Sequence, residues 1–211
     1  MALSKLAAKS FDLTDDYSFT GTVTGVNSTQ KLFLIKNIDC SGDSTISFVN
    51  GASSVVFDNT YKTYFFRFIN IHPSNNTTTF RVNFRDGGSD YDATKTTTFA
   101  AANQYENDSS TALAHASGAS QGNATGVQSI ATSVGGDDDE CFCGELFIFN
   151  PSDTTYVTHF IGMNQINNHS DVSAQEIYSG YCDVTAAIDA VQFSVSTGNF
   201  ASGRIALYGI K

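Results

Sequence analysis

Apolar and polar residues alternate along much of the chain beyond residue 31, and this alternation predicts β-strands. The clearest case is the segment Thr77–Arg85, where Phe80, Val82 and Phe84 are separated by polar residues. A period of two places one set of side chains in a core and the other in solvent. The segment Phe65–Ile71 is apolar at nearly every position, which is typical of a central strand buried on both faces.

Other stretches of similar length carry the same signals. Leu146–Phe149 is continuously apolar and is followed by Asn150 and Pro151, where the strand must end because proline cannot extend the hydrogen-bond ladder. We therefore predict strands over the following segments: Lys31–Ile38, Thr45–Asn50, Tyr61–His72, Thr77–Arg85, Ala93–Ala101, Cys141–Asn150, Tyr156–Met163, Gln175–Cys182, Ala190–Ser196 and Gly203–Tyr208.

Turn-forming residues separate these segments. Asp86–Asp90 contains two adjacent glycines and predicts a hairpin that joins Phe84 to Tyr91. Pro73–Asn76 predicts a similar turn, and Thr197–Gly203 predicts the last hairpin. The segments Ser109–His115 and Val184–Ala190 are short candidates for helix. The stretch Asn103–Gly136 is long for a loop, so we expect it to contain a helix, an extra strand or a subunit contact.

Short strands without an alternating strand–helix pattern predict an all-β fold, namely a single antiparallel β-sandwich over residues 26–211, jelly-roll-like in topology, with a barrel as the next choice. Residues 1–25 differ in pattern and predict a short N-terminal arm that attaches to its own domain or to a neighbouring subunit. The apolar residues expected to mediate assembly through this arm are Leu3, Leu6, Phe11, Leu13, Tyr17 and Phe19.

Composition and charge exclude some partners. The 211 residues include 11 Lys and Arg against 21 Asp and Glu, for a net charge of −10. Nucleic acid is not an expected partner, because phosphate binding needs a basic surface, and attraction to anionic membranes is disfavoured for the same reason. The first residues contain no apolar run of the kind that a secretion signal needs, so we expect synthesis and folding in a cytosol.

The four cysteines, Cys40, Cys141, Cys143 and Cys182, are expected to be free thiols in that compartment. A bridge such as Cys143–Cys182 and a metal site remain alternatives. A Cys-x-x-Cys knuckle, which a zinc site favours, does not occur in the sequence.

Candidate catalytic groups are few. The histidines His72, His115, His159 and His169 do not accompany a Gly-x-Ser-x-Gly or His-Glu-x-x-His motif. Structural histidines are therefore the favoured interpretation, and we expect neither enzymatic activity nor a cofactor. The tyrosines admit two interpretations, a sugar-stacking surface or cross-strand aromatic packing, of which packing is favoured. They are Tyr61, Tyr64, Tyr91, Tyr105 and Tyr178.

Two acidic clusters are candidates for Ca²⁺, because carboxylate oxygens are its preferred ligands. One is the group Asp86, Asp90 and Asp92, and the other is Asp137, Asp138 and Asp139, which precede Glu140. Solvated loops are the favoured interpretation of both clusters. The calcium-loop pattern spaces its acids at alternate positions, whereas the second cluster is a consecutive run.

Several blocks occur in an order that resembles a known family. They are Tyr64–Pro73, Arg85–Tyr91, Thr94–Thr98, Leu146–Ser152, His159–Phe160, Ala186–Phe193, Ser196–Asn199 and Ser202–Gly209. Together these blocks resemble small virion structural proteins, of the fibre or decoration type, from marine and cyanobacterial tailed bacteriophages. The opening Phe11–Gly25 is similar to the starts of phage fibre proteins. The Cys141-Phe142-Cys143 sequence and the acidic run depart from that pattern.

The resemblance implies a non-enzymatic structural protein on the particle surface, as a tail-fibre, head-fibre or capsid-decoration protein. It implies localisation in the virion, self-association as a homotrimer by analogy, and contacts with other virion proteins. The alternative hypothesis is a receptor-binding module that recognises host-surface glycan. A depolymerase is the third and weakest hypothesis.

Overall fold

The computed structural model describes residues 31–211. The predicted arm, with Leu3, Leu6, Phe11, Leu13, Tyr17 and Phe19, lies outside the described residues.

The described part of the chain folds into antiparallel strands with one short 3₁₀ turn, η2 (Ser117–Ala119), and no α-helix. The all-β prediction is confirmed. Each of the ten predicted segments coincides with a strand to within a few residues at its ends. The strands are β1 (Leu32–Asp39), β2 (Thr45–Val49), β3 (Thr63–Pro73), β4 (Thr78–Arg85), β5 (Lys95–Tyr105), β6 (Thr111–His115), β7 (Gln128–Val134), β8 (Phe142–Phe149), β9 (Thr158–Asn168), β10 (Val172–Cys182), β11 (Ala190–Val195) and β12 (Phe200–Ile210).

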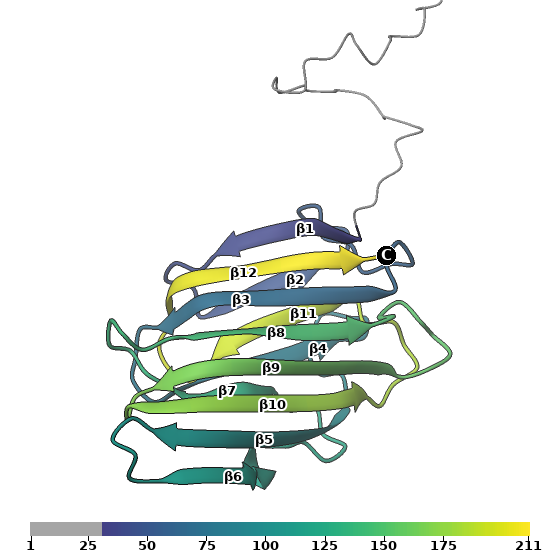
Figure 1. Cartoon of the computed structure of the whole chain (residues 1–211). Helices are drawn as coiled ribbons and strands as arrows, with labels where there is room; N and C mark the ends of the chain where they lie inside the picture. Colours follow the sequence, from purple (N-terminus) through teal and green to yellow (C-terminus); the bar gives the residue numbers. More distant parts are fainter. Residues whose placement is uncertain (1–30) are drawn as a thin grey trace, which may run out of the picture. The chain divides into compact units, whose positions relative to one another are not determined.

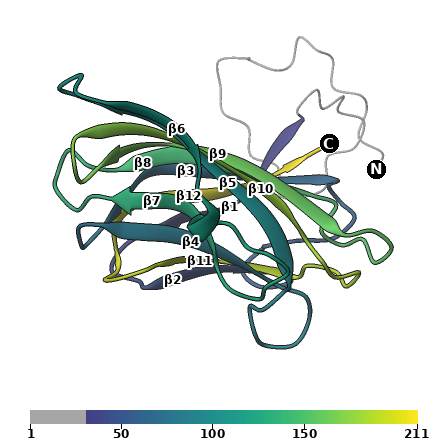
Figure 2. The same cartoon turned by 90° about the horizontal axis from the view of Figure 1, so that it is seen from below.

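All twelve strands belong to one curled sheet that forms a half-barrel. One side of the curl has the order β1-β12-β3-β8-β9-β10-β5-β6, and the other has the order β7-β4-β11-β2 (Figures 1 and 2). The two sides are joined at β7 and β9, whose ladder contains only the pair Val134 and Asn168. We call the surface of the first side that faces away from the core the outer face.

The core lies between the two sides, and phenylalanine is its most frequent residue. The ring of Phe80 on β4 lies 5.2 Å from that of Phe68 on β3 and 5.5 Å from that of Phe193 on β11. Phe80, Val82 and Phe84 are all buried, as their alternation predicts. Edge-to-face and offset ring pairs of this kind add to the free energy gained from burying apolar area.

Side-chain hydrogen bonds reinforce the weak ladder between β7 and β9. The Glu176 carboxylate on β10 accepts a hydrogen bond from the Thr132 backbone N–H at 2.8 Å and another from the Thr132 hydroxyl. Asn164 on β9 donates a hydrogen bond to the carbonyl of Ile130. These bonds attach β7 to the inner surface of β9 and β10.

The turns at Asp86–Asp90, Pro73–Asn76 and Thr197–Gly203 do not form hairpins, contrary to prediction. β4 pairs with β7 and β11, whereas β5 pairs with β6 and β10. Each of these turns instead carries the chain from one side of the curled sheet to the other. Glycines permit a reversal (Gly87 has φ +104°), but long-range packing decides whether the flanking strands pair.

Two helix predictions are also wrong. Ser109–His115 contains β6, and Val184–Ala190 is an irregular connection that ends at β11. The long stretch Asn103–Gly136 contains β6, η2 and β7. Alanine and leucine favour helix locally, but pairing with β5 supplies β6 with a hydrogen-bond ladder and overrides that preference.

The prediction that Phe65–Ile71 is buried on both faces holds only in part. Phe65, Phe66 and Phe68 are buried, whereas Arg67 and Ile69 are exposed on the outer face. β3 therefore has one core face and one face that turns to solvent towards its end.

Candidate interaction surface

Cross-strand neighbours form a row of aromatic and aliphatic side chains across the outer face. Phe65 on β3 is paired with Tyr208 on β12 and with Phe147 on β8. Phe147 is in turn paired with Ile161 on β9. The rings of Phe65 and Phe147 are stacked with centroids 4.7 Å apart, and Tyr208 lies 5.8 Å from Phe65.

The row continues into a surface that we call the apolar band. Phe149, Ile161, Met163 and Ile177 are each 40–47% exposed, and Phe147 is half-buried beside them. Adjacent strands place them together, since Met163 is paired with Ile177. A shallow hollow of about 220 Å³ lies among Phe147, Ile161, Met163 and Ile177, and Glu145 and Gly162 complete its lining. The apolar band is defined as Phe147, Phe149, Ile161, Met163 and Ile177.

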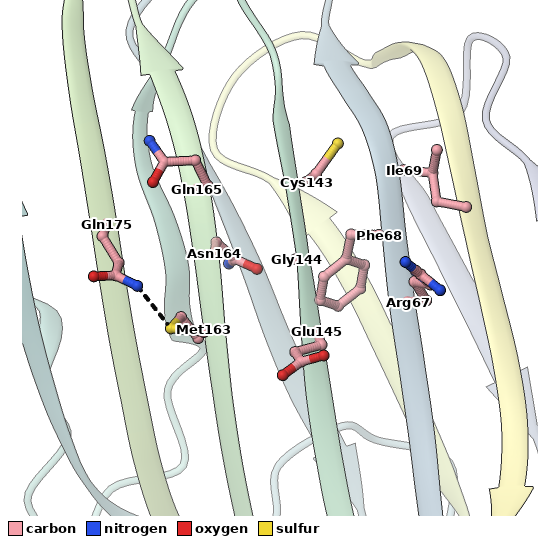
Figure 3. Close-up of a pocket in the computed structure, with 10 residues that line it drawn as sticks. All are labelled: Arg67, Phe68, Ile69, Cys143, Gly144, Glu145, Met163, Asn164, Gln165 and Gln175. Carbon is pink, nitrogen blue, oxygen red and sulfur yellow. Dashed lines mark hydrogen bonds between the residues drawn. The ribbon is translucent and has the colours of Figure 1, made fainter.

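A more polar hollow of about 420 Å³ adjoins the apolar band. Figure 3 shows that its lining side chains come from neighbouring strands of the outer face. The Gln175 side-chain amide donates a hydrogen bond to the Met163 sulfur at 2.9 Å, and that of Gln165 donates to the Ser173 hydroxyl at 2.9 Å. The lining residues are Arg67, Phe68, Ile69, Cys143, Gly144, Glu145, Met163, Asn164, Gln165 and Gln175.

Buried ionisable groups lie beneath the surface, where burial shifts their pKa values. Burial raises the pKa of Glu176 to about 7, against the lowering effect of its hydrogen bonds from Thr132. Burial lowers the pKa of Lys95 to about 8. The Lys95 ammonium donates to the carbonyl of Gly126 at 2.7 Å, so it holds the segment before β7. Both groups therefore have structural partners within the fold.

The six aspartates predicted as calcium candidates lie in two separate loops. Asp86, Asp90 and Asp92 belong to the connection from β4 to β5, and Asp137, Asp138 and Asp139 to that from β7 to β8. Within residues 31–211, the structure shows no group of three or more His, Cys, Asp or Glu side chains that could hold a metal ion. The structure therefore adds no support for a calcium site.

The four histidines lie in different parts of the fold. His72 is within 2.9 Å of the Asp137 carbonyl, and His169 is within 3.2 Å of the Ser133 carbonyl. His115 contacts the Ser120 hydroxyl at 3.2 Å, and the His159 ring lies 5.9 Å from that of Tyr181. Each ring has a contact within the fold, and the structural interpretation of these residues stays a prediction.

All four cysteines are free thiols. Cys40 and Cys182 are buried, and burial raises the pKa of each to about 12. Cys143 is exposed at the polar hollow, where its sulfur lies 3.2 Å from the backbone nitrogen of Asn70.

The tyrosines do not form one common surface. Tyr64 and Tyr178 are buried, and the Tyr64 ring packs edge-on against Tyr61 at 5.8 Å. Among the five candidates, only Tyr105 reaches 38% exposure. Tyr64 thus packs against aromatic rings, and Tyr178 is buried, whereas cross-strand aromatic packing of the five tyrosines stays a prediction.

Sequence reasoning missed the apolar band. One signal was present, because Phe160 and Ile161 are adjacent apolar residues in a segment that otherwise alternates. In a strand, neighbouring residues point to opposite faces, so one of the two had to lie outside the core. The register with β8 and β10, which the sequence does not reveal, decided that Ile161 joins Phe147 on the outer face.

A helix long and apolar enough to cross a membrane is not found within residues 31–211. Comparisons of the chain with known protein families, with curated proteins and with solved structures found no match.

Proposed function

We propose that this chain is a non-enzymatic structural protein of a bacteriophage virion, which acts by assembling with copies of itself and with neighbouring virion proteins. The observation that carries the assembly part of the proposal is the apolar band. The outer face carries an exposed apolar patch of a kind that soluble monomers seldom have. Its exposed members are Phe149, Ile161, Met163 and Ile177.

The composition of this surface resembles that of protein–protein interfaces. Interface cores are enriched in aromatic residues, methionine and arginine, and are depleted of lysine, glutamate and aspartate. Glu145, which lines both hollows, is the exception to this composition. Phe147, Phe149 and Met163 lie in the band, and Arg67 lies at the adjoining hollow. We therefore assign the band to contact with another copy of this chain.

The virion role rests on the ordered strand and turn blocks of the sequence, from Tyr64–Pro73 to Ser202–Gly209, which resemble small phage fibre and decoration proteins. A rigid β-sheet body with net negative charge suits a particle surface, because the charge keeps particles apart. The finer topology that we propose is a jelly-roll-like sandwich, and the assembly that we propose by analogy is a homotrimer.

Substitution in the centre of the band tests the assembly role. We expect Ile177→Lys to lower the mass of the assembly in multi-angle light scattering, because it places an unpaired charge in an apolar contact. The matched control is Thr45→Lys, which adds the same charge at an exposed position of β2 on the other side of the curl. An unchanged mass for Ile177→Lys would remove the band from the interface.

Purified particles test the virion role. Mass spectrometry of gradient-purified phage should detect the chain at a stoichiometric level, and electron microscopy should show its density on the outside of the head or tail. Absence of the chain from infectious particles would contradict the proposal.

The alternative function is recognition of host-surface glycan, and the polar hollow is the observation that favours it. Arg67, Glu145 and Gln165 supply donors and acceptors of the kind that hydroxyl groups need. If glycan binds there, Gln165→Ala should abolish retention on a glycan array, whereas Gln192→Ala on β11 should not. Equal binding by both variants would remove the hollow as a receptor site.

A further inference from the structure

Strand β6 ends the series of strands on the outer-face side of the sheet (Figure 1). All five of its residues are exposed, and Leu113 is 83% exposed. β6 pairs with β5 along one edge, and within residues 31–211 no strand pairs with its other edge. An edge of this kind offers unpaired N–H and C=O groups to another strand.

The direction of these groups follows from the ladder with β5. Tyr105 donates to the Ser110 carbonyl at 3.2 Å, and Ala116 donates to the Phe99 carbonyl at 2.9 Å. Since alternate residues of an antiparallel strand bond to the same neighbour, Ala112 and Ala114 also turn their backbone groups towards β5. Thr111, Leu113 and His115 therefore turn their N–H and C=O groups to the free edge.

We propose that β6 pairs antiparallel with β6 of a second copy of this chain, about a twofold axis that passes beside Leu113. In this register Leu113 of one copy lies opposite Leu113 of the other, and Thr111 lies opposite His115. Every backbone group that faces the free edge then donates or accepts one hydrogen bond. The two outer-face sheets become continuous across the contact.

The side chains of β6 favour a second copy as the occupant. The sequence Thr-Ala-Leu-Ala-His is nearly symmetric about Leu113, so small residues meet small residues across the axis. β6 contains no Lys, Arg, Asp, Glu or Pro, which are the residues that commonly block edge pairing. No like charges are brought opposite each other when the strand pairs with itself.

The other end of this strand series is protected, in contrast to β6. β1 contains Lys36 and a bulge between Leu34 and Lys36, and both features discourage regular pairing. β1 and β2 also border a common hollow that Lys36 and Ser47 help to line. β1 is therefore less suited than β6 to regular pairing with a partner strand.

The proposed contact adds a second surface to the apolar band. Leu113 is paired with Ala102, and Ala102 with Gln175, so Leu113 lies on the outer face. The twofold contact uses the strand edge, whereas the band uses side chains of β8, β9 and β10. The pairing at β6 does not depend on the virion role. If the apolar band forms a trimer, the pairing at β6 joins two trimers.

Introducing a charge at Leu113 tests the twofold axis directly, because this residue faces the same residue of the second copy. We expect the wild-type chain to form an assembly with an even number of copies in native mass spectrometry. Leu113→Lys and Leu113→Glu should each halve its mass through like-charge repulsion, and an equimolar mixture of the two variants should restore it. Leu113→Thr, a neutral strand former, should keep the wild-type mass, and circular dichroism should show the same β-sheet content for every variant.

Several results would overturn the proposal. They are a wild-type chain that is monomeric or has an odd number of copies, a charged variant that keeps the wild-type mass, and a mixture that does not restore it. Occupation of the edge by residues 1–30 of the same chain, or by another protein, would leave the mixture without rescue. A failed band test with Ile177→Lys leaves these outcomes unaffected, since Ile177 does not lie on β6.

Discussion

The phenol ring of Tyr178 occupies the space that a β-carbon at Gly162 would need. A β-carbon built there would lie 2.3 Å from Cζ of Tyr178 and 2.4 Å from its hydroxyl oxygen. Tyr178 on β10 crosses β9 at this point and donates a hydrogen bond to the Glu145 carbonyl on β8 at 2.8 Å. The absence of a side chain at residue 162 thus allows one tyrosine to connect three strands beneath the apolar band.

Gly162→Ala should destabilise the fold by about 1–3 kcal/mol, because overpacking forces the tyrosine ring or the strand to move. Urea unfolding followed by circular dichroism measures the change. Gly122→Ala is the control, since a β-carbon at Gly122 meets nothing within 4 Å. Equal stability of the two variants would show that Tyr178 can move without loss.

Phe68→Asp should abolish soluble folding, because it places a charge without a partner among buried phenylalanine rings. Phe68 is 1% exposed and lies 5.2 Å from Phe193 by ring centroids. The neighbouring Ile69 is 38% exposed on the opposite face, so Ile69→Asp should fold normally. Soluble yield and thermal melting compare the two, and normal values for Phe68→Asp would place the core elsewhere.

Glu176 should make the stability of the protein depend on pH. Its pKa is raised from 4.5 to about 7 by burial, so the folded state binds the proton more tightly than the unfolded state. The contribution of Glu176 to the free energy of unfolding is favourable at low pH, and it is lost as the pH rises from about 4.5 to about 7. The loss is about 2–3 kcal/mol between about pH 5 and about pH 8, at about 1.4 kcal/mol for each pKa unit.

Glu176→Gln isolates this contribution, because glutamine keeps the shape and stays neutral. The free energy of unfolding, measured by denaturant titration at the two pH values, should fall less in this variant than in the wild type. The difference between the two proteins is the relevant quantity, since other groups also titrate in this range. Identical pH dependence would mean that Glu176 is ionised in the folded state throughout.

The turns show that local sequence predicts where the chain reverses but not which strands then pair. The glycines within Asp86–Asp90 allow the chain to reverse, and this property can be predicted from residue type alone. Whether β4 then pairs with β5 depends on which strands bury each apolar face, and here β4 pairs with β7 and β11. The Ala-rich β6 is a second example, since its strand conformation depends on β5.

The sequence by itself determined ten of the twelve described strands and, where apolar and polar residues alternate, which residues enter the core. Alternation at Phe80, Val82 and Phe84 is a local property, because successive side chains of an extended chain point to opposite faces whatever the neighbours are. Only the tertiary structure decided that Phe147, Ile161 and Ile177 share one outer face, that Tyr178 passes over Gly162, and that one edge of β6 has no partner strand within residues 31–211. These relations join residues distant in the sequence through strand order and register, and the free energy that selects a register comes from the packing of the whole sheet.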